Sequence, residues 1–437
     1  MKKVFYILTI VTVVLVISSC HKFSPFDQVE GGKGQGNEGL QMLVVWNNAG
    51  IEAWTRFSSS TGPAPMAESR IYAIINIAMY DVLNSIKPTY KAYAFLSREE
   101  SDASIDAAIA TAAHDAIASL IPSQAAYADS LLQVSLSGIN NGISKQKGIE
   151  AGEAAAAAIL TKRTADGSED AQFAYTPGTL PGEYRATPPF DGPPFNGFVQ
   201  EPGWGNVKPF GLASSSQFRP VPPYPINSAD YTNDYNEVKS LGGSTSTTRT
   251  PDQTQIALFW AESAPSGWNR IARNLITMGN MDVWKSARLF ALVAMAEADA
   301  NIGSFDGKFF YNYWRPITAI RLGDSDGNPN TTGDTSWDVL LPPTPPVPDY
   351  PSNHAVNGGA ASEVLRDFFG DDNISFDATS LSLPGVTRHF TSFSQAAREN
   401  SLSRIYIGFH FRNAVAKGED EGNKIGKYIF DHYLKAL

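Results

Sequence analysis

The residues best suited to chemistry lie in three short segments in the last third of the 437-residue chain. Together they supply three cations, one hydroxyl and two imidazoles: Lys308, Arg315, Ser352, His354, Arg404 and His410. Such a set could neutralise a tetrahedral or trigonal-bipyramidal oxyanion, donate hydrogen bonds to its oxygens and transfer a proton near neutral pH. We find no nucleotide-binding loop or metal-ligand cluster in the sequence that would compete with this oxyanion site.

The first segment runs from Lys308 to Arg315-Pro316. On one continuous helix these two cations would lie almost two turns apart on the same face, so we expect both to reach one anion. Taken alone, such a pair is more often a solvated surface feature.

The second segment, residues 351–354, has the pattern of a helix N-terminus. Ser352 is a typical N-cap residue, and residues 355–369 can continue as a helix. The free N–H groups and the positive end of the helix dipole would then face an anion, with His354 in the first turn. Alone, the segment is more simply explained as a capped helix with a surface histidine.

The third segment places Arg404 and His410 six residues apart, so they cannot share one helical face. Apolar neighbours such as Ile405 and Phe409 predict that His410 is buried. A buried histidine is ordinary by itself, so the inference depends on all three segments together.

Taken in order, the segments resemble the signature of a superfamily that joins type 2 phosphatidic acid phosphatases, bacterial acid phosphatases and vanadium-dependent haloperoxidases. That signature reads Lys-x6-Arg-Pro, Pro-Ser-Gly-His and Ser-Arg-x5-His-x3-Asp, and the chain matches nearly all of it. Tyr-Trp-Arg-Pro-Ile at 313–317, Pro-Asp-Tyr at 348–350 and Ser-Arg-Ile-Tyr at 403–406 are similar to the soluble haloperoxidase branch. A looser resemblance extends from about Trp46 to the C-terminus.

The resemblance implies an all-α fold of two packed helical bundles with long irregular connections and the active site in the C-terminal bundle. It also implies vanadate as the cofactor, whose place phosphate could take, with hydrogen peroxide and a halide as reaction partners. The residues implied to hold vanadate are Lys308, Arg315, Ser352, Asn353, Arg404 and His410. His410 would bind vanadium directly and His354 would be the acid–base group; Lys308 is counted with them as catalytic.

Two alternatives remain open. A soluble acid or lipid phosphatase would use His410 to attack the phosphorus of a phosphate ester, forming a phosphohistidine, and His354 to protonate the leaving alcohol. A non-catalytic surface lipoprotein would keep the fold without the chemistry.

Two positions depart from the signature. Asn353 replaces its glycine, which predicts a side chain beside the anion and a tighter pocket. Ala414 replaces the aspartate that orients the nucleophilic histidine in the phosphatases. Asp299 or Glu399 could orient one of the histidines instead.

The N-terminus resembles a bacterial lipoprotein signal peptide at residues 1–20. Lys2 and Lys3 precede an apolar run at 4–17, and Ser-Ser-Cys ends at Cys20, the single cysteine. We expect lipidation at Cys20 and a flexible tether at 21–39; an uncleaved anchor or an ordinary signal peptide are the alternatives. The protein would be lipid-anchored in the cell envelope of a Gram-negative-type bacterium, periplasmic or surface-facing, and would touch the membrane only there.

Composition and periodicity define the elements that must position the site. The net charge of −10 and the pI near 5.2 argue against a nucleic-acid partner. Helical periodicity predicts one all-α domain over 40–437, with an N-terminal half at about 40–163 and a catalytic half at about 228–437. The proline-, glycine- and aromatic-rich linker between them, 164–227, is expected to pack over the domain. The sequence does not indicate the oligomeric state.

The expected helices include 66–86, 105–120, 149–160 and 281–302. Thr250 to Gln253 has the pattern of a capping box. Asp299 falls in a mostly apolar helical row, so we expect it to be hydrogen-bonded. No convincing period-two strand is found.

Overall fold

The computed structural model describes residues 39–437, apart from residues 63, 97–100 and 280. The predicted signal peptide, Cys20 and all of the tether except Gly39 lie outside the described residues, so those interpretations stay predictions. Within the described ranges, none of the helices is both long and apolar enough to span a bilayer.

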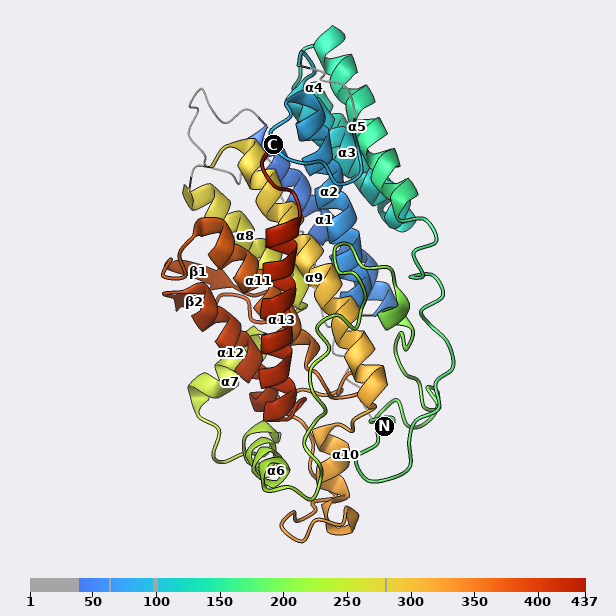
Figure 1. Ribbon diagram of the computed structural model, residues 1–437, viewed down its shortest axis with the longest axis vertical. Helices are drawn as coiled ribbons and strands as arrows, with labels where there is room; N and C mark the ends of the chain where they lie inside the picture. The colour runs from blue at the N-terminus through green and yellow to red at the C-terminus, as the bar shows by residue number, and fades with distance from the viewer. Residues whose placement is uncertain (1–38, 63, 97–100, 280) are drawn as a thin grey trace, which may run out of the picture.

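The described chain is a set of α-helices joined by long irregular segments, with one small β-hairpin (Figure 1). The α-helices are α1 (Leu40–Thr61), α2 (Pro65–Ile86), α3 (Ile105–Leu120), α4 (Ala125–Ser137), α5 (Ile143–Lys162), α6 (Ala229–Gly242), α7 (Pro251–Phe259), α8 (Ala264–Gly279), α9 (Val283–Tyr311), α10 (Pro316–Arg321), α11 (Asn353–Phe369), α12 (Phe393–Tyr406) and α13 (Arg412–His432). Three short 3-10 turns are η1 (Pro122–Gln124), η2 (Trp204–Asn206) and η3 (Gly323–Ser325). The all-α prediction is confirmed.

The hairpin was not expected. Strands β1 (Phe376–Thr379) and β2 (Thr387–Phe390) pair antiparallel, with Phe376 opposite Phe390. Each strand has only four residues, which is too short for an alternating pattern to stand out in the sequence.

Local sequence signals define several helix ends. Ser104 accepts a hydrogen bond from the N–H of Ala107 and begins α3, while Thr250 and Gln253 form the predicted capping box of α7. Helix α9 extends nine residues beyond the predicted end at 302 and terminates at Asn312, which adopts a left-handed conformation with φ of 48°.

Helix α9 lies at the centre of the molecule, with α2 on one side and α11 and α13 on the other (Figure 1). Helices α3, α4 and α5 pack together beside α1 and α2, far along the molecule from α6 and α10. One apolar core runs through both halves; it includes Trp46, Ile75, Phe290 and Val364.

Helices α11 and α13 pack closely because glycines line their contact. A Cβ on Gly422 would collide with the carbonyl oxygen of Val356, and one on Gly426 with that of Ala360. This close approach fixes the position of α11, whose N-terminus carries the second segment.

The segment 164–227 is irregular and packs against the helices. Trp204, Val207 and Phe210 are buried, and η2 lies against α9. Asp299 of α9 anchors the segment by accepting hydrogen bonds of 2.6–2.8 Å from three consecutive backbone N–H groups, those of Phe210, Gly211 and Leu212.

Candidate active site

The first segment does not lie on one helix, so the reason given for the convergence of Lys308 and Arg315 is wrong. Helix α9 ends at Tyr311, and Arg315 is the N-cap of α10 in an extended conformation. Asn312 terminates the first helix, and Pro316 disfavours a helical conformation at the residue before it. The two cations nevertheless come together around Asp349 and His410. Nζ of Lys308 donates to the carbonyl oxygen of Asp349, whose side chain lies 2.9 Å from Nδ1 of His410, and Nη1 of Arg315 lies 2.9 Å from Nε2 of the same ring.

Lys308 is fully buried beneath the chain that leads into α11. Its Nζ donates to the carbonyl oxygens of Pro348 (2.8 Å), Asp349 (3.1 Å) and Pro351 (2.7 Å). Burial lowers the pKa of Lys308, and Arg315 lowers it further. Three acceptors around one nitrogen still fit the ammonium form, because a neutral amine has only two N–H groups.

Arg315 is buried as well and binds neutral groups. Its Nε donates to the carbonyl oxygen of Val347 (2.7 Å) and its Nη1 to that of Phe409 (3.0 Å). The same Nη1 lies 2.9 Å from Nε2 of His410. Arg315 thus joins the segment before α11 to the segment after α12.

Ser352 is the N-cap of α11, as predicted, but its hydroxyl does not cap the helix. The backbone N–H of Ser352 donates to the carbonyl oxygen of Ala414 (2.9 Å), whereas its Oγ is buried without any hydrogen-bond partner among the described residues. A buried hydroxyl without a partner is costly, which suits a position where a ligand completes the site.

The side chain of Asn353 is turned toward α9, whereas the sequence predicted that it would lie beside the anion. Its Oδ1 accepts from the hydroxyl of Ser304, and its Nδ2 donates to Oδ1 of Asn301 (2.9 Å), so the amide points at α9. Asn301 and Ser304 give the amide a polar site that a motif-level comparison cannot reveal. The backbone N–H of Asn353, at the start of α11, is unaffected by this orientation.

His354 occupies the first turn of α11 in a defined tautomer. Its Nε2 lies 2.9 Å from the carbonyl oxygen of Glu262, which can only accept, so Nε2 carries the proton. Burial lowers the pKa of His354 to about 3, with a further contribution from Arg404. The neutral ring therefore has Nδ1 free to accept a proton.

Arg404, near the end of α12, is the third buried cation. Its Nε donates to Oγ of Ser403 (2.9 Å) and its Nη2 to the carbonyl oxygen of Trp260. Burial lowers the pKa of Arg404 to about 9, and the charge of Arg315 adds to the effect. Within the described chain, no carboxylate forms an ion pair with Lys308, Arg315 or Arg404.

His410 is 4% exposed, as its apolar neighbours predicted. Burial lowers the pKa of His410 well below its ordinary value, and Arg315, Lys308 and Arg404 lower it further. Its Nδ1 lies 2.9 Å from Oδ1 of Asp349.

Asp349 was not among the predicted site residues. It is fully buried, and burial raises its pKa to about 7 against the opposing effect of Arg315. The sequence contained a usable signal, since Asp349 is a carboxylate three residues before Ser352 in the same motif.

The proposed supporting carboxylates are elsewhere, so neither orients a histidine. Asp299 binds the three backbone N–H groups at 210–212. Glu399 accepts from Nε1 of Trp260 (3.0 Å) and from Arg388 (2.6 and 2.8 Å). Both carboxylates are occupied in holding the fold.

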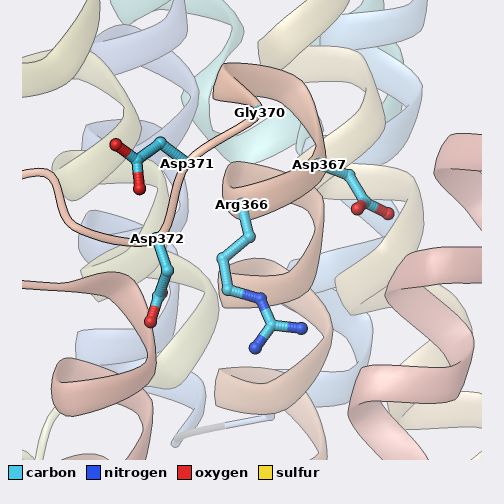
Figure 2. A pocket seen from close by; sticks show the side chains of 5 residues that line it. All are labelled: Arg366, Asp367, Gly370, Asp371 and Asp372. Carbon is cyan, nitrogen blue, oxygen red and sulfur yellow. The ribbon is translucent and has the colours of Figure 1, made fainter.

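A separate polar depression lies at the other end of α11 (Figure 2). Its lining residues are Arg366, Asp367, Gly370, Asp371 and Asp372. From Asn353 to Arg366 the helix rises by about 20 Å, so this depression is remote from the two histidines.

The arrangement can therefore hold an oxyanion. Three buried cations have neutral hydrogen-bond partners, the Ser352 hydroxyl lacks a partner, and α11 begins at the same place. An oxyanion such as vanadate or phosphate fits this site, because it would bring negative charge to the three cations and an acceptor to the Ser352 hydroxyl.

A protein-family model and a known protein both match part of the chain. A family model described as the VCPO second helical-bundle domain matches residues 288–437. The vanadium chloroperoxidase of Curvularia inaequalis is 30% identical over 287 residues, which cover 50% of this chain and 46% of the fungal protein. The chain thus spans about half the length of that relative.

Solved structures extend the likeness over most of the chain. The crystal structure of the first bacterial vanadium-dependent iodoperoxidase has a TM-score of 0.77 and 28% identity, covering 90% of this chain and 97% of that one. A holo-type bacterial vanadium-dependent chloroperoxidase, at 18% identity with a TM-score of 0.68, covers 85% of this chain and 92% of its own and shares the fold.

Proposed function

The chain belongs to the vanadium haloperoxidase superfamily, and from this premise we propose that it binds vanadate beside His410 and oxidises a halide with hydrogen peroxide. One observation carries the proposal. Lys308, Arg315 and Arg404 are buried together, and none of them forms an ion pair with a carboxylate among the described residues. Burial raises the pKa values of the two nearby carboxylates, Asp349 and Glu421, so a bound oxyanion would supply much of the negative charge that balances the three cations.

Each residue has a role in this proposal. The three cations would neutralise the oxygens of vanadate, while the Ser352 hydroxyl and the Asn353 backbone N–H would donate hydrogen bonds to them. Nε2 of His410 would hold the metal. Bound vanadate would supply the Lewis-acidic centre at which peroxide becomes reactive toward halide.

His354 would move the proton. Its Nε2–H is held by the carbonyl oxygen of Glu262, and its neutral Nδ1 can accept a proton from hydrogen peroxide as the substrate binds. Before an anion binds, burial lowers the pKa of His354 to about 3, so Nδ1 is unprotonated at neutral pH.

The test is vanadate binding to residues 21–437 by calorimetry, followed by peroxide-dependent bromination and iodination of a dye in the same sample. The variant His410→Ala should lose both vanadate binding and peroxide-dependent halogenation. His389→Ala is the matched control, because His389 is an exposed histidine whose side chain is 63% accessible.

Each result has a defined meaning. Tight vanadate binding with halogenation, both lost in His410→Ala, supports the proposal. Binding without halogenation contradicts it and favours a phosphatase, in which vanadate acts as a phosphate mimic. Failure to bind any oxyanion would refute both enzymes and leave a non-catalytic lipoprotein.

We also propose that Cys20 is lipidated and anchors the protein in the cell envelope. The residue pattern at 1–20 is the support for this. Incorporation of a labelled fatty acid in the full-length chain, and its loss in Cys20→Ala, would test the anchor; unchanged labelling in that variant would contradict it.

A further inference from the structure

Asp349 lies beside His410 but has no part in the function proposed above. We propose that Asp349 is the positioning residue of His410: its carboxylate holds the proton on Nδ1 and leaves Nε2 as the atom that faces the oxyanion. This inference rests on the proposed function, because it specifies how the vanadate ligand is oriented.

The contact with Arg315 defines the tautomer of His410 independently. A guanidinium group can only donate hydrogen bonds, and Nη1 of Arg315 lies 2.9 Å from Nε2 and 3.4 Å from Nδ1 of His410. The shorter contact favours a lone pair on Nε2. A neutral imidazole with its lone pair on Nε2 carries its one proton on Nδ1, the atom that lies 2.9 Å from Oδ1 of Asp349.

Asp349 is the carboxylate within reach of that proton. Its Oδ1 lies 2.9 Å from Nδ1 of His410. Both carboxylate oxygens are buried, and no described residue gives either of them a well-aligned hydrogen bond, although the backbone N–H of Phe411 is close enough to lower the pKa of the carboxyl. A small rotation that aligns the Nδ1–H with Oδ1 would satisfy the carboxylate and fix the ring.

The backbone of Asp349 is held on both sides, so its carboxylate has a defined position. Its N–H donates to the carbonyl oxygen of Tyr313 (2.8 Å), and its own carbonyl accepts from Nζ of Lys308 (3.1 Å). These contacts connect Asp349 to the first segment, while its side chain reaches the third.

The location of Asp349 also accounts for Ala414. The signature places a carboxylate four residues after its last histidine, where this chain has alanine. Ala414 is buried and uses its carbonyl oxygen to hold the N–H of Ser352. The orienting carboxylate is thus supplied from three residues before Ser352 rather than from four residues after His410.

The experiment uses protein labelled with ¹⁵N-histidine, with His410→Ala to assign the ring signals of His410. In the free protein we expect a neutral His410 with the proton on Nδ1. A proton on Nε2 in the unmodified protein would overturn the proposal without recourse to any variant.

Three variants then test the carboxylate itself. Asp349→Ala should give a mixture of tautomers and weaken vanadate binding by about 10- to 100-fold. Asp349→Asn should keep the Nδ1–H tautomer, because the amide oxygen still accepts. Adding Ala414→Asp to Asp349→Ala should restore part of the lost affinity, which general loss of packing would not allow.

Asp377→Ala is the matched control, since Asp377 makes the same 2.9 Å contact with Nδ1 of His389 on the exposed hairpin. An unchanged tautomer and unchanged affinity in a folded Asp349→Ala would refute the proposal. If the unmodified protein binds no vanadate, the proposed function fails, while the tautomer measurement still tests Asp349 by itself.

Discussion

Glu297 leads to a quantitative prediction about stability. This residue of α9 is fully buried; its Oε2 accepts from Nδ2 of Asn269 (3.0 Å), but its Oε1 has no partner within the described chain. Burial raises the pKa of Glu297 well above its ordinary value, and the nearby carboxylate of Glu68 raises it further. The folded protein therefore holds Glu297 protonated at pH values where the unfolded chain ionises it.

The change Glu297→Gln removes this difference between the two states. In the unmodified protein, unfolding above pH 4.5 releases the proton of Glu297, so the free energy of unfolding falls by about 1.4 kcal/mol per pH unit. Glutamine has no such proton. Its amide does leave an N–H group at the unpartnered position, a pH-independent cost of about 1–3 kcal/mol.

The expected result is a stability difference that changes with pH. Between pH 5.5 and pH 7.5 the variant should become steadily more stable relative to the unmodified protein, by up to about 1.4 kcal/mol per pH unit. Urea unfolding followed by circular dichroism at four or more pH values measures this difference. Glu153→Gln, at an exposed position on α5, is the matched control. A difference that is flat across pH would refute the buried, protonated state of Glu297.

Three further predictions concern other contacts. Ser352→Ala should weaken vanadate binding in calorimetry by about 10- to 100-fold and change the unfolding free energy by less than about 1 kcal/mol, because its Oγ has no partner. Asn353→Gly should lower the unfolding free energy by about 1–3 kcal/mol through loss of its two α9 contacts, yet keep vanadate binding. His114 contacts Asp115 (2.7 Å) and Asp129 (2.8 Å), which raise its pKa, so His114→Gln should destabilise the protein at pH 6 by up to about 1 kcal/mol.

The sign of the His114 effect follows from its raised pKa. The stabilisation is complete below the ordinary pKa of 6.5 and disappears as the pH rises through the higher value of the folded protein, so the variant should be less destabilised at pH 9 than at pH 6. Equal destabilisation at both pH values would contradict this. Unchanged vanadate binding in Ser352→Ala, or full stability in Asn353→Gly, would contradict the other two predictions.

Local rules predicted those parts of the fold that short stretches of sequence determine. The helix at 105–120 has its predicted bounds, the capping box at Thr250 forms, and Ser352 begins α11. In each case the side chains that determine the element lie within a few residues of it.

The features that the sequence did not predict depend on contacts between distant segments of the chain. The contact between Asp349 and His410 joins residues 61 positions apart, and the amide of Asn353 finds partners on α9. The sequence did not reveal that the helix ends between Lys308 and Arg315. Two cations can lie together either because they share one helical face or because the chain turns back between them. Asp299 was correctly expected to be hydrogen-bonded, but only the structure shows that its carboxylate accepts these bonds from backbone N–H groups.

The contacts of Lys308 bear on how the site would fill. An ammonium group has three N–H bonds, and the carbonyl oxygens of Pro348, Asp349 and Pro351 already accept all three. An oxyanion that accepts a hydrogen bond from Nζ must therefore replace one of these carbonyl oxygens as the acceptor. Lys308 also holds the peptide that carries Asp349, so an oxyanion that bound to Nζ would weaken this contact.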